Sequence, residues 1–268
     1  MNYANYHTHT TFCDGRDTAE DMVLAAIAAG CPELGFSGHS YLPFDDDWNM
    51  NPETAAEYRR EVNRLRETYK DRISIRLGIE QDICSPTDEL DLYEYSIGAV
   101  HCLFPDGNYL SVDLSAEGVR EGVETLYGGD PYAYAEDYFS QVGSTWERTH
   151  CAILAHFDLL TKFLDRDPLL NPDDARYQRA ATLALEQIFE TPAAIELNTG
   201  AMVRGYRTEP YPSAAWLTLI GKAQHPVILS SDAHERENIT FWFDEAMQLV
   251  SRYRLNLIAR LEDLPAMR

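Results

Sequence analysis

The sequence has no hydrophobic run long enough to cross a membrane and too few basic residues to balance its acidic ones. Its 268 residues include 22 Lys and Arg against 44 Asp and Glu, for a formal net charge of −22 at pH 7. A membrane span needs roughly 20 apolar residues in a row, and the N-terminus lacks a basic-then-apolar signal pattern. Phosphate backbones repel so acidic a chain, so neither a nucleic-acid nor a membrane partner is expected.

Cysteine is also scarce. The five cysteines are odd in number and scattered, and no Cys-x-x-Cys occurs. This usage favours reduced thiols in a reducing compartment over a disulfide framework, so we expect a cytoplasmic protein. Cys13 and Cys102, which flank candidate metal ligands, are interpreted as small packing residues.

Short apolar runs alternate with longer helical patterns along the chain. Seven runs rich in Ile, Val, Leu and Ala predict strands buried on both faces, over residues 2–7, 33–39, 73–80, 95–101, 152–156, 193–198 and 226–232. Helices are predicted after Thr18 and over residues 51–69, 130–149, 171–190, 213–224 and 239–253. The alternation predicts a parallel α/β architecture, which a closed barrel and an open doubly wound sheet both satisfy.

Polar residues able to bind metals follow the predicted strands. They include six of the eight histidines, and the set is His7, His9, His39, Glu80, His101, His156, Asn198, Asp232 and His234. In a parallel barrel the carboxyl ends of the strands meet on one face, where active sites of such barrels lie, so this placement favours the barrel. His150 and His225 fall at the other ends of their strands and are interpreted as structural.

His7 and His9 alone have a simpler explanation, because residues i and i+2 of a strand share one face and two imidazoles there can simply be solvated. The other strand ends favour a metal site. Imidazole and carboxylate together suit Zn, Mn or Fe. Closing the barrel groups the donors as His7 and His9 with Asp232 and His234, as Glu80 with His101 and His156, and as Asp14 with His39 and His234. Glu80 is placed to bridge two ions.

Eight motifs resemble the polymerase-and-histidinol-phosphatase (PHP) superfamily, and more closely its histidinol-phosphate phosphatase branch. They are YHTHTTFCDG, GFSGHS, GIEQD, YSIGAVH, AHFDLLTKF, ELNTG, PYPS and LSSDAH, and they extend from residue 3 to about residue 235. The resemblance implies one distorted, TIM-like (β/α)7 barrel over residues 1–268 and three metal ions. It assigns His7, His9, Glu80 and Asp232 to one ion, Glu80, His101 and His156 to a second, and Asp14, His39 and His234 to a third.

We therefore expect a metal-dependent phosphomonoesterase with two to three divalent Zn, Mn or Fe ions. L-Histidinol phosphate, an intermediate of histidine biosynthesis, is the expected substrate, attacked by a metal-bridging hydroxide, with Glu80, Asp232 and His234 in catalytic roles. No Gly-x-Ser-x-Gly elbow or Walker-type loop occurs. A different small phosphoester or nucleotide is the alternative substrate, and a non-catalytic metal-binding barrel is the alternative class.

Four cations are candidates for binding the phosphate: Arg16, Lys162, Arg204 and Arg207. Lys162 and Arg204 are preferred because they follow neighbouring strands; each of the four can instead be a surface cation paired with an acid. Residues 102–129 exceed usual barrel-loop lengths and are a candidate lid. The acids of residues 44–50 either meet a cationic amine of the substrate or belong to a solvated turn. The oligomeric state stays open.

Overall fold

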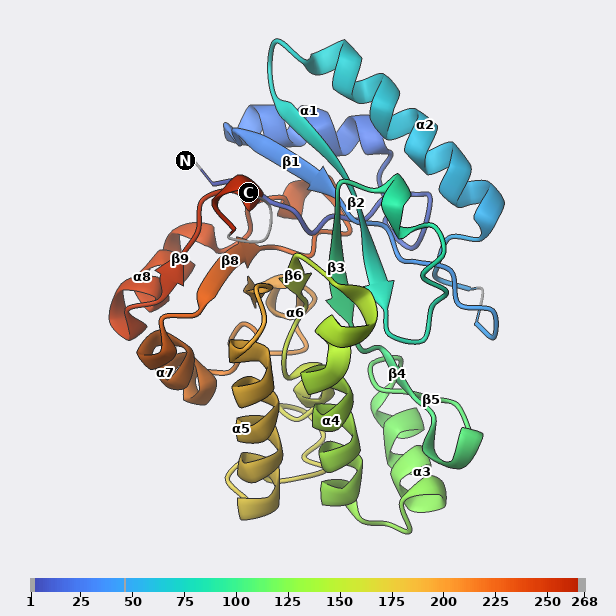
Figure 1. Cartoon of the computed structure of the whole chain (residues 1–268), viewed down its shortest axis with the longest axis vertical. Helices are drawn as coiled ribbons and strands as arrows, with labels where there is room; N and C mark the ends of the chain where they lie inside the picture. The colour runs from blue at the N-terminus through green and yellow to red at the C-terminus, as the bar shows by residue number, and fades with distance from the viewer. Residues whose placement is uncertain (1–2, 46, 265–268) are drawn as a thin grey trace.

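Seven parallel strands form the sheet of the computed structural model, which describes residues 3–45 and 47–264. Their order is β1 (Glu33–Phe36), β2 (Ser74–Asp82), β3 (Tyr95–Ala99), β6 (Ile153–Leu154), β7 (Ala194–Asn198), β8 (Pro226–Ser230) and β9 (Asn256–Leu257). β4 (Cys102–Leu103) and β5 (Leu110–Ser111) form a separate antiparallel hairpin. The parallel α/β prediction is confirmed, and the sheet curls with helices around it (Figure 1).

The N-terminal segment joins the two sides of the curled sheet. Asn5 pairs with Leu34 of β1, and Thr8 pairs with Ala233, just beyond β8. The prediction of a strand over residues 2–7 is wrong in detail: residue 2 lies outside the described residues, and the rest makes single bridges to two different neighbours instead of one ladder. β9 was not predicted, because its two paired residues carry no readable alternation.

The helices are α1 (Ala19–Ala29), α2 (Pro52–Tyr69), α3 (Ala116–Leu126), α4 (Pro131–Thr149), α5 (Ala175–Phe189), α6 (Gly200–Val203), α7 (Ala214–Ala223) and α8 (Phe243–Tyr253). Short 3₁₀ turns lie at Leu90–Leu92, Pro105–Gly107, Leu159–Thr161, Arg236–Asn238 and Leu261–Asp263. The side chains of Thr18, Asn51 and Asp130 cap α1, α2 and α4 as predicted. α5 starts later than predicted, because Asn171 closes a turn with Asp174 and it is Asp174 that caps the helix.

Tyr95 on β3 ties the N-terminal segment to the sheet from inside the barrel. Its hydroxyl lies 2.6 Å from the carbonyl oxygen of Tyr6 and 2.9 Å from that of Phe36. The ring fits only because two neighbouring positions are glycine: a Cβ would lie 2.2 Å from the ring at Gly78 and 2.3 Å from the hydroxyl at Gly35. This packing fixes the segment that leads into His7.

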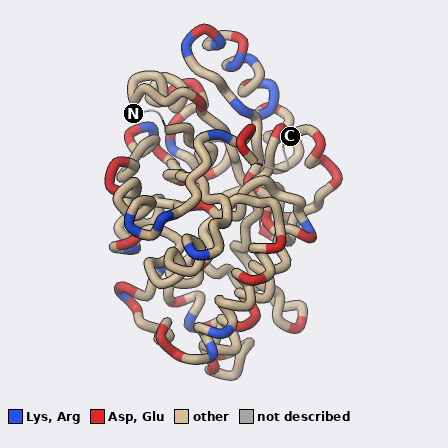
Figure 2. The backbone as a smooth tube through the Cα atoms, turned by 60° about the vertical axis from the view of Figure 1, so that its left-hand side comes forward, with Lys and Arg blue, Asp and Glu red and all other residues tan. Residues whose placement is uncertain are grey.

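Outside the sheet, α4 and α5 run side by side and cover one part of it, while α1 and α2 cover another (Figure 1). Acidic residues lie around the whole outline of the chain (Figure 2). No helix in the described part of the chain is both long and apolar enough to span a membrane.

Candidate metal centre

Glu80 lies at the middle of a cluster of imidazoles at the carboxyl ends of the strands. It is buried near the carboxyl end of β2, and its two carboxylate oxygens face different groups of imidazole rings. Oε2 lies 3.2 Å from His7 Nε2, 3.5 Å from His9 Nε2 and 2.9 Å from His39 Nδ1, while Oε1 lies 3.3 Å from His101 Nε2 and 3.1 Å from His156 Nε2. One carboxylate therefore contacts five imidazoles.

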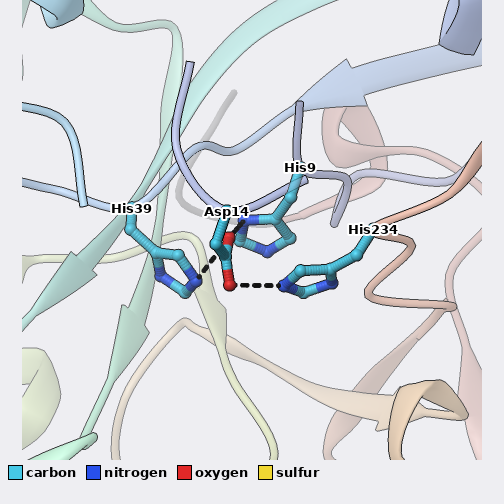
Figure 3. Close-up of side chains that lie close together, drawn as sticks. All are labelled: His9, Asp14, His39 and His234. Carbon is cyan, nitrogen blue, oxygen red and sulfur yellow. Dashed lines mark hydrogen bonds and ion pairs between the residues drawn. The ribbon is translucent and has the colours of Figure 1, made fainter. Parts of the chain in front are cut away.

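Asp14 gathers a second group of rings, drawn in Figure 3. Its Oδ1 lies 3.7 Å from His9 Nδ1 and 3.5 Å from His39 Nε2, and its Oδ2 lies 3.1 Å from His234 Nε2. The turn that carries Asp14 requires glycine at the next position, because a Cβ on Gly15 would lie 2.4 Å from a backbone nitrogen of the same turn.

Asp232 connects the two groups. Its Oδ1 lies 3.3 Å from His9 Nε2 and 3.5 Å from His234 Nδ1, and its Oδ2 accepts a hydrogen bond from Arg204 at 3.1 Å. Asp232 has a left-handed φ of 47°. Such a conformation is unfavourable for a residue with a Cβ, is tolerated best by Asp and Asn, and occurs often at functional sites.

The structure thus brings the nine predicted donors together on one face. Donor atoms within 4.8 Å of one another occur in three groups there: His9, Asp14, His39 and His234; His7, His9 and Asp232; and His39, Glu80 and His101. These groups overlap the predicted ligand sets but differ in detail, because His9 and His39 each stand between two groups.

Three buried atoms of this cluster that could bind a metal ion have no hydrogen-bond partner among the described residues. They are His7 Nε2, His9 Nε2 and Glu80 Oε2. A buried polar atom without a partner is costly, and such atoms in native proteins usually have an ion or water as partner. Imidazole nitrogens around carboxylate oxygens are ligands that Zn, Mn and Fe accept. The residues present fit divalent transition-metal ions.

The charges of the cluster are strongly coupled. Burial lowers the pKa of His7, but the carboxylates of Glu196 and Glu80 outweigh burial and hold that pKa well above its ordinary 6.5. Burial and the neighbouring imidazole of His234 lower the pKa of His9 to about 3. Without metal, His7 therefore carries a proton among carboxylates, in a place where a cation is electrostatically favoured.

Two carboxylates that the sequence reasoning missed orient the rings. Glu196 on β7 lies with Oε1 2.6 Å from His7 Nδ1, and its Oε2 accepts from the backbone N–H of His156 at 3.0 Å. Asp82 on β2 accepts from the backbone N–H of His101 at 2.8 Å. Both are acidic residues, Glu196 within a predicted buried strand and Asp82 just after one. Because a buried charge needs a partner, their position in the sequence could have identified them.

A cavity of about 250 Å³ opens beside the cluster, and two of the four predicted cations line it, Lys162 and Arg204. Lys162 Nζ donates to the carbonyl oxygen of Asp113 at 2.8 Å and lies 3.0 Å from its Oδ2. Arg204 Nη1 also donates to the backbone oxygen of Asp232 at 3.3 Å.

The other two predicted cations do not reach the cavity. Arg16 is exposed and pairs with Glu235. Arg207 is buried, donates to Glu209 at 3.1 Å and stacks 4.5 Å from the ring centroid of Tyr211. Because neither side chain lines the cavity, Lys162 and Arg204 are the two that remain candidates for binding phosphate.

Both candidate rim segments contribute to the cavity wall. Residues 102–129 form the β4–β5 hairpin and α3, and Ser111, Asp113 and Leu114 of this segment line the cavity. Asp45 and Trp48 of residues 44–50 line it as well, while Asp46 lies outside the described residues.

The two histidines interpreted as structural lie elsewhere. His150 ends α4 in a left-handed conformation, and His225 Nε2 lies 2.7 Å from the carbonyl oxygen of Ala193.

Comparison with known protein families matches residues 5–200 to the PHP domain. Among curated proteins, the chain is 28% identical over 257 residues to a Deinococcus radiodurans protein named "Probable histidinol-phosphatase", covering 90% of each chain. It is 25% identical over 264 residues to the histidinol-phosphatase of Bacillus subtilis, covering 90% of this chain and 97% of that one.

Among solved structures, the chain resembles a histidinol phosphate phosphatase from Lactococcus lactis complexed with zinc, L-histidinol and phosphate. The TM-score is 0.71 at 19% sequence identity, and the match covers 96% of this chain and 95% of that one. At this identity the likeness establishes the fold, which is the predicted barrel type.

Proposed function

Because this chain belongs to the PHP domain family, we propose that it is a metal-dependent phosphomonoesterase that hydrolyses L-histidinol phosphate to L-histidinol and phosphate. The observation that carries the proposal is the buried carboxylate of Glu80 among five imidazoles, at the bottom of a cavity with Lys162 and Arg204 on its wall. The relatives named histidinol-phosphatase support the choice of substrate.

The proposal includes two to three divalent ions, with Zn, Mn and Fe as the candidates. The residues that would hold them are His7, His9, Glu80 and Asp232 for one ion, Glu80, His101 and His156 for a second, and Asp14, His39 and His234 for a third. When bound, such ions lower the pKa of water and stabilise negative charge on phosphoryl oxygens.

The remaining side chains bind and orient. Lys162, held by Asp113, presents its ammonium group to the cavity and would donate to non-reacting phosphate oxygens. Arg204 has a double role, because its guanidinium contacts both the carboxylate and the backbone oxygen of Asp232 while facing the same cavity. Asp232 and His234 lie within contact distance of each other and of Arg204. A phosphate bound by Arg204 would therefore lie close to both of these side chains.

A phosphate-release screen tests the proposal. Metal-loaded protein is offered L-histidinol phosphate, nucleoside monophosphates and sugar phosphates at equal concentrations. The expected result is the highest kcat/KM for L-histidinol phosphate. A clear preference for another ester overturns L-histidinol phosphate as the substrate and leaves the metal-centre proposal intact. If none of the esters releases phosphate, the proposed phosphatase activity is contradicted.

A further inference from the structure

The wall of the cavity carries charges of both signs. Outside the predicted metal ligands, its cations are Lys162 and Arg204 and its carboxylates are Asp45 and Asp113. Asp113 is paired with Lys162 at 3.0 Å, and Arg204 is paired with Asp232 at 3.1 Å. Asp45 differs from the others, because no Lys, Arg or His within residues 3–45 and 47–264 forms an ion pair with its carboxylate. The cavity thus contains one negative charge without a cationic partner.

Hydrogen bonds hold Asp45 in place. The hydroxyl of Tyr109, from the chain between β4 and β5, donates to Asp45 Oδ2 at 2.6 Å. Burial and the Asp45 carboxylate raise the pKa of Tyr109, so this phenol stays protonated and keeps donating at neutral pH. The backbone of Asp45 is bonded to Leu42 and to the side chain of Asn49. One carboxylate oxygen, Oδ1, is left to accept from a ligand.

Aromatic contacts hold the residues Phe44 and Trp48, which lie close to Asp45 in the sequence. The ring of Phe44 lies 4.8 Å from that of Phe104 and 5.4 Å from that of Tyr109, measured between centroids. Trp48 stands edge-on to His39 with centroids 4.6 Å apart. These contacts join Phe44 to the β4–β5 hairpin and Trp48 to the metal cluster. Asp45 is therefore part of the cavity wall and does not belong to a free surface turn.

We propose that Asp45 is the residue that selects substrates with a protonated amine next to the phosphate ester. This inference rests on the proposed function and names the part of the substrate that the site distinguishes. The phosphoryl group goes to the cationic side of the cavity, and the ammonium group of the same small molecule pairs with Asp45 through a charge-assisted hydrogen bond. An ester without the amine leaves the Asp45 carboxylate unpaired beside a phosphate dianion, which disfavours its binding.

The test compares L-histidinol phosphate with its desamino analogue, which has the same imidazole, chain and phosphate but no amine. Asp45→Asn is expected to lower kcat/KM for L-histidinol phosphate by about 10- to 100-fold, mainly through KM, because it removes one charged hydrogen bond. For the desamino analogue the variant is expected to equal the wild type or exceed it. Tyr109→Phe removes the hydrogen bond that holds the Asp45 carboxylate but keeps the carboxylate itself. It is expected to lower kcat/KM for L-histidinol phosphate by a smaller factor.

Asp47→Asn is the matched control, because Asp47 is an exposed acid of the same segment and does not line the cavity. It should match the wild type with both substrates, and metal content should be equal in all variants. Equal losses with both substrates, or no loss with either, overturn the role of Asp45 while leaving the phosphatase in place. A wild-type enzyme that hydrolyses the desamino analogue as efficiently as L-histidinol phosphate overturns this inference while leaving the phosphatase in place.

Discussion

Among single residues, Glu80 is the one that connects the most predicted ligands of the metal centre. Its carboxylate contacts five imidazoles, and burial would raise its pKa, but the charges of His7, His39 and His101 outweigh burial and hold that pKa well below its ordinary value. Glu80 is therefore ionised across the physiological range and offers one oxygen to each side of the cluster. No other carboxylate of the described cluster reaches as many rings.

Replacing Glu80 by Gln should remove more activity than the loss of any one terminal histidine. The amide has nearly the same shape but no charge to offset either ion, so bound metal and hydrolysis should fall together. Elemental analysis and phosphate release on the same sample measure both. His234→Ala is the comparison, since it removes one ring from the Asp14 group. A Glu80→Gln protein with full metal content and near-normal rate would show that Glu80 is not a bridge.

Lys162→Ala should weaken catalysis without loss of metal. Removing one charged hydrogen bond to phosphate costs roughly 10- to 150-fold in kcat/KM. A contact kept equally in ground and transition states would raise KM, whereas one made only in the transition state would lower kcat. Arg16→Ala is the control, because Arg16 is exposed and lies outside the cavity. Wild-type kinetics in Lys162→Ala would leave phosphate binding to Arg204 and the ions.

Metal binding should release protons near pH 7. The pKa values of His7 and His101 are held well above 6.5, in each case because nearby carboxylates outweigh burial, so both rings are protonated in the metal-free protein. A ligating imidazole must lose that proton, so apparent metal affinity should rise with pH and fall as the solution is made more acidic. Calorimetric titration with Zn²⁺ in buffers of different ionisation enthalpy counts the protons. Binding that releases none would contradict the assignment of these rings as ligands.

Among helices and strands, local signals predicted where α1, α2, α4 and α7 begin, whereas α5 and α8 begin later than predicted. Thr18, Asn51 and Asp130 act as caps as the sequence indicates, because capping depends on a few adjacent residues. The N-terminal segment makes single bridges to β1 and to a residue beyond β8, and β9 pairs with β8 over only two residues, so the sequence pattern indicates neither pairing. The donors at strand ends were predictable from residue type and position. Glu196 and Asp82 were not singled out, because their partners His7 and His101 lie on other segments of the chain.

The fit of Tyr95 against glycine gives a test of this interior packing. Gly78→Ala places a Cβ 2.2 Å from the Tyr95 ring in the unrelaxed structure, so the ring must shift and overpacking should cost about 1–3 kcal/mol. Thermal unfolding measures the loss. The double variant Gly78→Ala with Tyr95→Leu should lose less stability than the sum of the losses of the two single variants, because the smaller leucine leaves room for the added methyl group. Strict additivity would mean that the added methyl meets something other than the ring.

At the scale of the whole molecule, a strongly acidic chain concentrates imidazoles and two cations at one face of a barrel. With 44 acidic and 22 basic residues, the protein as a whole repels phosphate, so attraction of the substrate has to come from the metal centre and the cavity wall. Acidic residues lie around the outline of the chain (Figure 2). Lys162 and Arg204 are the lysine and arginine that line the described cavity. This distribution favours a small ester that enters the cavity over any extended polyanion.

Removing the metal ions and restoring them tests whether hydrolysis depends on the metal centre. Purified protein is stripped with a strong chelator, then titrated with Mn²⁺ or Zn²⁺ while phosphate release from L-histidinol phosphate is followed beside bound metal. We expect the stripped protein to lose hydrolysis, and we expect the activity to recover in step with the binding of two to three ions per chain. Hydrolysis that persists at the same rate in the metal-free protein, or a chain that binds less than one ion after supplementation, would contradict this expectation.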